Sequence, residues 1–251
     1  MQGDGRTVKH DEIGLRRRIV EALCIATAFG LWLLHVSRLA ELPTAFSWWS
    51  LVLVPAGMAT ADFCSGLVHW AADTWGRESM PVIGRRLLHP FRVHHVNPDD
   101  LLNRSFLDAN GDVAAIMLPI LAAMFWLPLD SAAGQSVFTL MLGLTGVGLW
   151  TNQVHQWAHM AHPPWPVWRL QDCRIILSRQ VHQRHHRAPH VTDYCIATGW
   201  CNAALNRMDF FRRLEAAITR ATGWTARDDE ARFHLATSGR RMPPVGKEAL
   251  P

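Results

Sequence analysis

The chain has 251 residues, of which 49% are hydrophobic, and its formal net charge at pH 7 is +4. This length fits one domain with a substantial core, and the apolar fraction is high for a chain whose two ends are polar, so a membrane protein is the first expectation. A positive charge also suits nucleic acid, but the chain carries no nucleic-acid-binding signature. We therefore predict no nucleic-acid partner and assign the arginines to anionic lipid headgroups. The five cysteines form no CxxC pair, and their spacing calls for no disulfide.

Four apolar runs are long enough to cross a bilayer as helices, and they cover about 19–36, 48–75, 113–129 and 136–151. The first follows Arg16, Arg17 and Arg18 and precedes no convincing cleavage site, which favours a retained signal anchor with the N-terminus in the cytoplasm. We predict an all-α fold, an integral membrane helical bundle of about four transmembrane helices. Its predicted parts are a cytoplasmic tail at 1–18, a membrane domain at 19–225 and a mobile tail at 226–251.

Two of the apolar runs end in polar stripes with the same helical spacing. Steps of four, three and four residues place side chains on one face of a helix. The first stripe is Asp62, Gly66, His69 and Asp73, and the second is Gly148, Asn152, His155 and His159. Ionisable groups at membrane depth are functional candidates by default, and this holds for Asp62 as well as for the histidines.

The densest histidine cluster lies in the run 180–190, QVHQRHHRAPH. Because positions three and four apart share a helix face, His182, His185 and His186 could close on one metal ion. His190 could join them after the break at Pro189.

Another cluster, HPFRVHH, ends in the adjacent His94 and His95, which need a local bend or different metals if both are ligands. The role of His89 is ambiguous: its spacing to His94 resembles that of a ligand pair, but Pro90 interrupts the helix that such a pair would require. The remaining histidines are not expected to ligate: His10, His35 and His234 are interpreted as surface or interfacial residues, and His162 is confined within HPPWP.

The chain thus offers about ten candidate ligands, more than one structural zinc needs. They are His69, Asp73, His94, His95, His155, His159, His182, His185, His186 and His190. Imidazoles with one or two carboxylates suit iron, copper or zinc, and two metals are the economical interpretation. With the N-terminus in the cytoplasm, four spans bring every cluster to the cytoplasmic side, and the weakly charged outward loops agree with the positive-inside rule.

Two stretches follow the last cluster. The apolar stretch Tyr194 to Leu205 is too short to span and is expected to be re-entrant or packed beneath the site. The stretch Asp209 to Thr222 has the pattern of an amphipathic interfacial helix, with an ordinary packing helix as the alternative.

Several motifs occur together between about Thr60 and Thr222: DFCSGLVHWAADTWG, PFRVHH, FLDANGD, TNQVHQWAH, HQRHHRAPH and TGW. In combination they resemble the plasmanylethanolamine desaturases, also called Kua or CarF-like lipid desaturases. The resemblance implies an integral membrane enzyme with two histidine-ligated iron ions that uses O2 and an external electron donor. It implies desaturation of the 1-O-alkyl chain of a plasmanyl phospholipid between C1 and C2, which gives the vinyl ether of a plasmalogen.

The resemblance also assigns roles to residues. It places the nine histidines of the ten candidates in the metal site and makes Asp73 their acidic partner. Asn110, Asp112, Asn152 and Gln153 match polar neighbours of the site. Val181 and Arg104 stand at or beside positions where the family has further histidines, which leaves the lipid headgroup and the exact substrate open.

The chain contains no Rossmann fingerprint, haem motif or iron–sulfur cysteine pattern, so a ferredoxin, flavoprotein or cytochrome b5-like donor is expected in trans. Two alternatives stay open. One is an acyl-lipid desaturase or hydroxylase with the same metal site, similar to the plant plastid enzyme that acts on phosphatidylglycerol, and the other is a metal transporter or sensor. The arginine-rich composition suggests a bacterium, in which case the membrane is the inner one.

Overall fold

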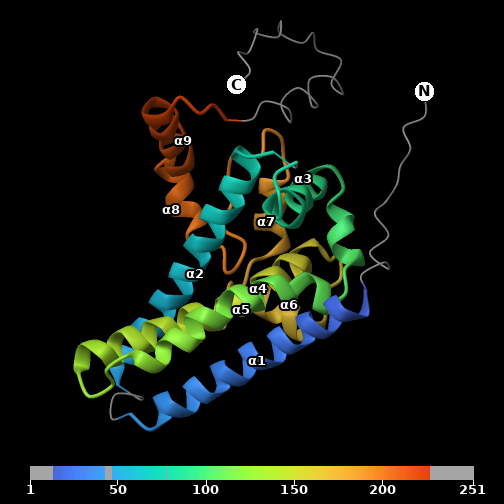
Figure 1. Ribbon diagram of the computed structural model, residues 1–251. Helices are drawn as coiled ribbons and strands as arrows, with labels where there is room; N and C mark the ends of the chain where they lie inside the picture. The colour runs from blue at the N-terminus through green and yellow to red at the C-terminus, as the bar shows by residue number, and fades with distance from the viewer. Residues whose placement is uncertain (1–13, 43–46, 78, 227–251) are drawn as a thin grey trace, which may run out of the picture.

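The computed structural model describes residues 14–42, 47–77 and 79–226, and within these ranges the chain forms helices and no strand (Figure 1). Four segments are long and apolar enough to cross a membrane: α1 (Leu15–Ala40), α2 (Trp48–Thr74), α4 (Phe106–Ala123) continued by the 3-10 helix η4 (Met124–Trp126), and α5 (Ala132–His159). The predicted all-α fold with four candidate spans is confirmed. The predictions for the tails, including His10 and His234, fall mostly on 1–13 and 227–251, outside the described residues.

Two spans are longer than the apolar runs indicated, because serine caps start them earlier. The Oγ of Ser105 accepts a hydrogen bond from the N–H of Asp108 (3.3 Å), so α4 contains FLDANGD in its first turns. The Oγ of Ser131 accepts in the same way from the N–H of Gly134 (3.1 Å) at the start of α5. At its other end α5 continues to His159, so TNQVHQWAH is helical throughout.

The helices α2 and α5 cross with backbone against backbone. A Cβ at Gly57 would collide with the carbonyl of Leu140, and a Cβ at Gly143 would collide with the carbonyl of Val54. Small residues at a helix crossing allow such an approach between membrane helices. This crossing fixes the relative positions of the C-terminal ends of α2 and α5, where both polar stripes lie.

The helix α1 packs along α4 and completes the core of the bundle. The buried side chains of this core are Ile25, Ala28, Ala114, Leu121, Met124, Phe138, Leu142 and Leu149. Large apolar side chains such as Leu33, Leu51 and Ile116 remain exposed on the outer faces. An apolar outer surface is the surface expected of a bundle whose solvent is lipid.

The prediction for His35 was wrong, because the structure buries this side chain completely. Its Nε2 lies 2.8 Å from the carbonyl oxygen of Leu121, and its ring lies between Phe125 and Phe138. The last carbonyls of a helix lack intrahelical partners, and Leu121 lies in the last turn of α4. The side chain of His35, on α1, is therefore a hydrogen-bond partner for a carbonyl group at the C-terminal end of α4.

The shorter elements gather at one end of the bundle, around the C-terminal ends of α2 and α5 (Figure 1). They are the π-helical turn η2 (Gly84–Leu88), α3 (His89–Val96), the 3-10 helix η3 (Pro98–Asn103), α6 (Trp165–Asp172), α7 (Arg179–His185), α8 (Asn202–Arg207) and α9 (Phe210–Thr222).

The two stretches beyond the last histidine cluster both pack on the protein. Residues 195–197 are buried, so the packed alternative for this apolar stretch is the one the structure takes. The helix α9 lays Phe211 against Trp70 and Tyr194, with ring centroids 5.5 and 4.9 Å apart. Its apolar face thus contacts α2 and the segment after α7, as the ordinary packing alternative expects.

Candidate metal centre

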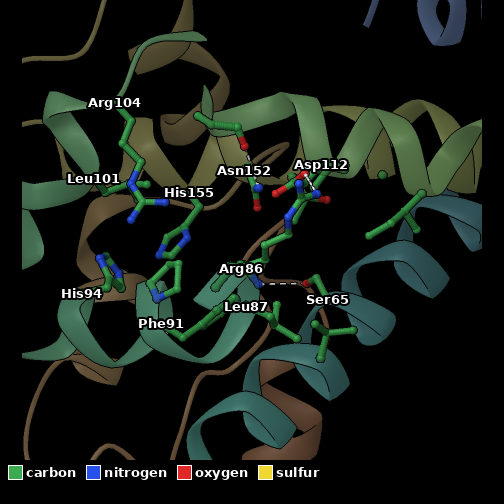
Figure 2. Close-up of a pocket in the computed structure, with 18 of the residues that line it drawn as sticks. Ser65, Arg86, Leu87, Phe91, His94, Leu101, Arg104, Asp112, Asn152 and His155 are labelled. Atoms are coloured by element: carbon green, nitrogen blue, oxygen red, sulfur yellow. Dashed lines mark hydrogen bonds and ion pairs between the residues drawn. The ribbon is translucent and has the colours of Figure 1, made fainter. Parts of the chain in front are cut away.

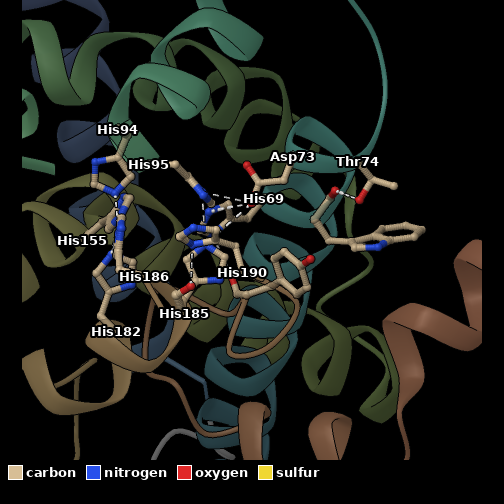
Figure 3. Close-up of polar contacts among 12 residues, drawn as sticks. His69, Asp73, Thr74, His94, His95, His155, His182, His185, His186 and His190 are labelled. Carbon is tan, nitrogen blue, oxygen red and sulfur yellow. Dashed lines mark hydrogen bonds and ion pairs between the residues drawn. The ribbon is translucent and has the colours of Figure 1, made fainter. Parts of the chain in front are cut away.

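Histidines from four helices converge at this end of the bundle (Figure 3). α2 contributes His69 and Asp73 from its last turns, α3 contributes His94 and His95, and α5 contributes His155 and His159. His182 and His185 come from α7, and His186 follows at its C-terminal end. These residues form two groups that could each hold a metal ion, with the ligand atoms of each group within 4.8 Å of one another.

The five-histidine group consists of His94, His155, His159, His182 and His186. The Nε2 atom of His182 lies at its centre, 2.9 Å from that of His155, 2.6 Å from that of His159 and 3.0 Å from that of His186. The Nε2 of His186 in turn lies 3.1 Å from that of His94. All five rings therefore direct Nε2 toward one point.

The carboxylate group consists of His69, Asp73, His95 and His185, all of them buried or nearly so. The Oδ2 of Asp73 lies 3.3 Å from the Nε2 of His69, 3.3 Å from that of His95 and 3.6 Å from that of His185. The Nε2 atoms of His95 and His185 are 3.2 Å apart. One carboxylate thus faces three imidazoles.

Hydrogen bonding alone does not account for the five-histidine group. A neutral imidazole nitrogen carries either one proton or one lone pair, whereas the Nε2 of His182 faces three other Nε2 atoms. Several neutral imidazole nitrogens turned toward one point are a donor set that could hold a transition-metal ion.

Backbone carbonyls orient two rings of the carboxylate group from behind. The Nδ1 of His69 lies 3.0 Å from the carbonyl oxygen of Tyr194, and the Nδ1 of His185 lies 2.8 Å from that of Thr192. An Nδ1–H donated to a carbonyl leaves Nε2 with its lone pair, the arrangement typical of metal-ligating histidines.

The protonation states also suit metal binding. Burial, followed by the neighbouring His159 and His95, lowers the pKa of His186 to about 3. Burial also holds the pKa values of His94, His182 and His185 well below the usual range. These imidazoles are therefore neutral at pH 7, and the neutral form is the one that binds metal.

The structure does not bring His182, His185 and His186, which could have closed on one ion, into one group. His182 and His186 are one helical turn apart and share a group, whereas His185 precedes His186 by one residue and points into the other group. The adjacent His94 and His95 divide between the groups in the same way, as one of the two alternatives expected.

Two further histidines lie beside the groups. The Nδ1 of His190 is 3.0 Å from the carbonyl oxygen of His185, and its ring centroid is 4.7 Å from that of His95, but it belongs to neither group. Pro90 occupies the first turn of α3, where proline is tolerated, so the reason given against His89 was wrong. His89 nevertheless joins neither group.

Asp62 acts on the backbone and not on either histidine group. Its fully buried carboxylate accepts hydrogen bonds from the N–H groups of Ala197 (3.2 Å), Thr198 (2.7 Å), Gly199 (2.8 Å) and Cys201 (3.0 Å). These bonds tie the segment after α7 to α2. The carbonyl that orients His69 belongs to the same segment.

Three of the polar residues from the FLDANGD and TNQVHQWAH motifs fasten α4 to α5. The Nδ2 of Asn110 donates to the Oε1 of Gln153 (3.2 Å), and the Nδ2 of Asn152 donates to the carbonyl of Ala109 (2.7 Å). Sequence reasoning missed Gln156, although it lies within TNQVHQWAH. Its Nε2 donates to the carbonyls of Leu101 (2.8 Å) and Arg104 (3.0 Å) and holds η3 against α5.

A cavity of about 270 Å³ adjoins the five-histidine group (Figure 2). α2, α4 and α5 supply its apolar walls, including Val113, Met117 and Leu144, and His94 and His155 of the five-histidine group also line it. Charged residues line it as well; they are Arg86, Asp100, Arg104, Asp108 and Asp112. Sequence reasoning missed Arg86, and it named Arg104 solely as a departure from the family pattern.

Comparison with known proteins places this arrangement in a family. The family described as a lipid desaturase domain matches residues 58–229. The chain belongs to the lipid desaturase family. It is 36% identical to the plasmanylethanolamine desaturase of Myxococcus xanthus over 92% of this chain and 84% of that one. It is 40% identical to the plasmanylethanolamine desaturase 1 of Mus musculus over 72% of this chain and 69% of that one.

The chloroplastic fatty acid desaturase 4 of Arabidopsis thaliana is 36% identical over 64% of this chain and 49% of that one. No solved structure matches this lipid desaturase. The matched region includes both histidine groups and the cavity, and it leaves out α1. Membership makes the protein a membrane lipid desaturase, an oxidoreductase, and this replaces the transporter alternative.

Proposed function

We propose that this lipid desaturase introduces the C1–C2 double bond into the 1-O-alkyl chain of plasmanyl phospholipids. The observation that carries the proposal is the cavity, because one space joins an apolar lining, charged side chains and His94 and His155. Asn152 precedes His155 by three residues on α5, and both Asn152 and Asp112 of α4 line the same cavity as His155. A bond next to the headgroup therefore suits this cavity better than a bond in mid-chain.

Two iron ions, one in each group, are the cofactors that we propose. His94, His155, His159, His182 and His186 would hold one, and His69, Asp73, His95 and His185 would hold the other. When bound, the irons supply the activation of O2 and the removal of hydrogen from carbon. The overall reaction takes two hydrogens from the lipid and two electrons and two protons from outside, and it reduces O2 to two waters.

The residues of the chain contribute positioning and the exclusion of water. Val113, Ile116 and Met117 of α4 face Leu144 of α5 across the cavity and provide an apolar bed for an alkyl chain. Leu144 precedes His155 by eleven residues, which is about 16 Å along the axis of α5. A chain that lies along this wall presents its headgroup end to the histidines.

The test is to express the full chain in cells that contain plasmanyl phospholipids and to measure acid-labile vinyl ethers by lipid mass spectrometry. We expect a product two mass units lighter than the substrate that acid cleaves to an aldehyde. Loss of two hydrogens from an ester-linked chain would point to the acyl-lipid alternative, which the similarity to fatty acid desaturase 4 favours. Gain of one oxygen would indicate a hydroxylase.

The electrons would come from a separate ferredoxin, flavoprotein or cytochrome b5-like protein. We propose that this donor meets the enzyme on the cytoplasmic side of a bacterial inner membrane, where both termini would also lie. The gathering of both histidine groups at one end of α2 and α5 supports a single side for the chemistry. Iron analysis of the purified protein should give about two ions per chain.

A further inference from the structure

The cavity beside the five-histidine group opens on one side of the bundle. Cys64 and Val68 of α2 and Ile116 of α4 line it and are also exposed, Ile116 to 62%. A residue that both lines a cavity and is exposed lies at its rim. Cys64 and Val68 are four residues apart and share one face of α2, so they form one edge of the opening, and Ile116 lies on the other.

The other two seams between the helices around the cavity are closed. α2 and α5 approach backbone to backbone at Gly57 and Gly143. α4 is fastened to α5 where the Nδ2 of Asn152 donates to the carbonyl of Ala109 (2.7 Å). The residues of α5 that line the cavity are accordingly buried or half-buried. The opening therefore lies between α2 and α4, and we call it the lateral opening.

The lateral opening lies within two candidate membrane spans and has an apolar rim. An exposed apolar patch at this place in a membrane protein faces the acyl chains of the bilayer. Charged groups stand at one end of the same seam, where the Nη1 of Arg86 on η2 lies 3.4 Å from the Oδ1 of Asp112, one helical turn before Ile116 (Figure 2). The opening thus runs from a charged end into an apolar one, as a phospholipid does from headgroup to chains.

The cavity is too small to enclose a phospholipid. Its volume is about 270 Å³, whereas pockets that enclose a drug-sized ligand have roughly 300–1,000 Å³. A phospholipid with two long chains is larger than such a ligand. Most of the lipid must therefore remain outside while the reacting part lies beside His94 and His155.

We propose that the lipid substrate enters sideways from the bilayer through the lateral opening, and that it binds with one chain in the cavity while its second chain stays among the bilayer lipids. The inference rests on the proposed use of the cavity for the lipid substrate. It adds a rule of specificity: the enzyme discriminates between lipids by the shape of the reacting chain and tolerates variation in the other.

The first experiment fills the lateral opening and measures binding, so it does not depend on turnover. The full-length protein, purified in detergent, is titrated with a 1-O-alkyl-2-acyl phospholipid, and the bound lipid is counted by native mass spectrometry. Cys64→Trp and Ile116→Trp place a large ring at the rim from opposite helices. Because added bulk in a fitted space is unfavourable, we expect each variant to weaken binding by about tenfold.

Two matched controls place the same ring on the same helices away from the opening. Ala115→Trp changes an exposed neighbour of Ile116, and Leu51→Trp changes a residue of α2 that is 77% exposed; neither position lines the cavity. Both should bind lipid as the wild type does. All four variants replace exposed side chains, so their thermal unfolding midpoints should match that of the wild type.

The second experiment compares two lipids that differ in which chain is branched. One carries a methyl-branched chain at the 1-O-alkyl position and a straight 2-acyl chain, and the other carries the reverse. A close-packed cavity resists the extra methyl groups, whereas the bilayer accepts them. We expect the branched alkyl chain to weaken binding about tenfold and the branched acyl chain to change it less than twofold.

Two outcomes would overturn the inference. If Cys64→Trp and Ile116→Trp bound lipid as the two controls do, the lipid would not pass between α2 and α4. If both branched lipids were weakened equally, both chains would lie within the protein.

The failure of the proposed reaction would look different. Rim variants that weakened binding in an enzyme that formed no vinyl ether would overturn the ether chemistry and leave the lateral opening standing. Vinyl ether formation with unchanged binding in both rim variants would overturn the inference alone.

Discussion

At the scale of single residues, the five-histidine group can be tested by removing one of its ligands at a time. His155→Ala and His186→Ala each remove one candidate ligand from the five-histidine group and leave four imidazoles, while the carboxylate group stays intact. We expect turnover to be abolished and iron to be bound more weakly, so that the iron content falls below that of the wild type. Iron analysis and vinyl-ether formation check this prediction together.

The matched control is His162→Ala, an exposed histidine three residues beyond His159 that belongs to neither group. This variant should keep both its iron and its activity. Full activity in His155→Ala and His186→Ala would show that the five-histidine group is not the metal site.

At the scale of elements, Asp62 joins α2 to the segment that follows α7. Asp62→Ala would leave four N–H groups without their acceptor, two of them buried and two partly buried, and each unsatisfied buried donor costs about 1–3 kcal/mol. We expect a clear drop in the thermal unfolding midpoint. Because the carbonyl of Tyr194 in this segment orients His69, metal affinity should also fall about 10- to 100-fold.

Asp172→Ala is the control for this variant, since Asp172 is exposed at the end of α6. It should leave both the unfolding midpoint and the metal affinity unchanged. An Asp62→Ala protein with normal stability and normal iron binding would mean that these hydrogen bonds do not hold the segment.

The crossing of α2 and α5 gives a second prediction at this scale. A methyl group at Gly143 would collide with the carbonyl of Val54, so Gly143→Ala must push the two helices apart. We expect a loss of about 1–3 kcal/mol in stability, typical of overpacking, together with loss of iron, because both helices carry ligands at their C-terminal ends. Gly30→Ala is the control: a Cβ there meets nothing within 4 Å, so the protein should be unaffected.

The same elements show how far the sequence predicts the site. Periodicity within one helix was enough to pair His69 with Asp73 and His155 with His159, because i to i+4 spacing is a local property. The division of the 182–186 cluster between two groups depends on how α7 is rotated against α3 and α5. This rotation is a property of the packed fold, so the local sequence pattern does not predict it. The contacts of His35 with α4 and of Asp62 with 197–201 join residues about 90 and 140 positions apart, so they follow from the packed fold alone.

At the scale of the whole molecule, the four candidate spans and the position of the histidine groups lead to a prediction for the orientation in the membrane. Both histidine groups lie at the C-terminal ends of α2 and α5, which an even number of spans returns to the side of the N-terminus. Arg16, Arg17 and Arg18 stand at the start of α1, whereas the turn around Asp130 between η4 and α5 carries no lysine or arginine. By the positive-inside rule we propose that the two histidine groups face the cytoplasm.

Reporter fusions in a bacterial host test this orientation. Alkaline phosphatase is active only outside the cytoplasm, so we expect high activity from a fusion after Asp130, which ends beyond the third span, and low activity from a fusion after Asn103, which ends beyond the second. Green fluorescent protein joined to the C-terminus of the full chain should fluoresce, since it folds in the cytoplasm. The reverse pattern would place the histidines outside the cytoplasm, where ferredoxins and other cytoplasmic donors could not reach them. Equal phosphatase activity from both fusions would contradict the crossing of the membrane by α4, and with it the four-span bundle on which the position of the metal centre depends.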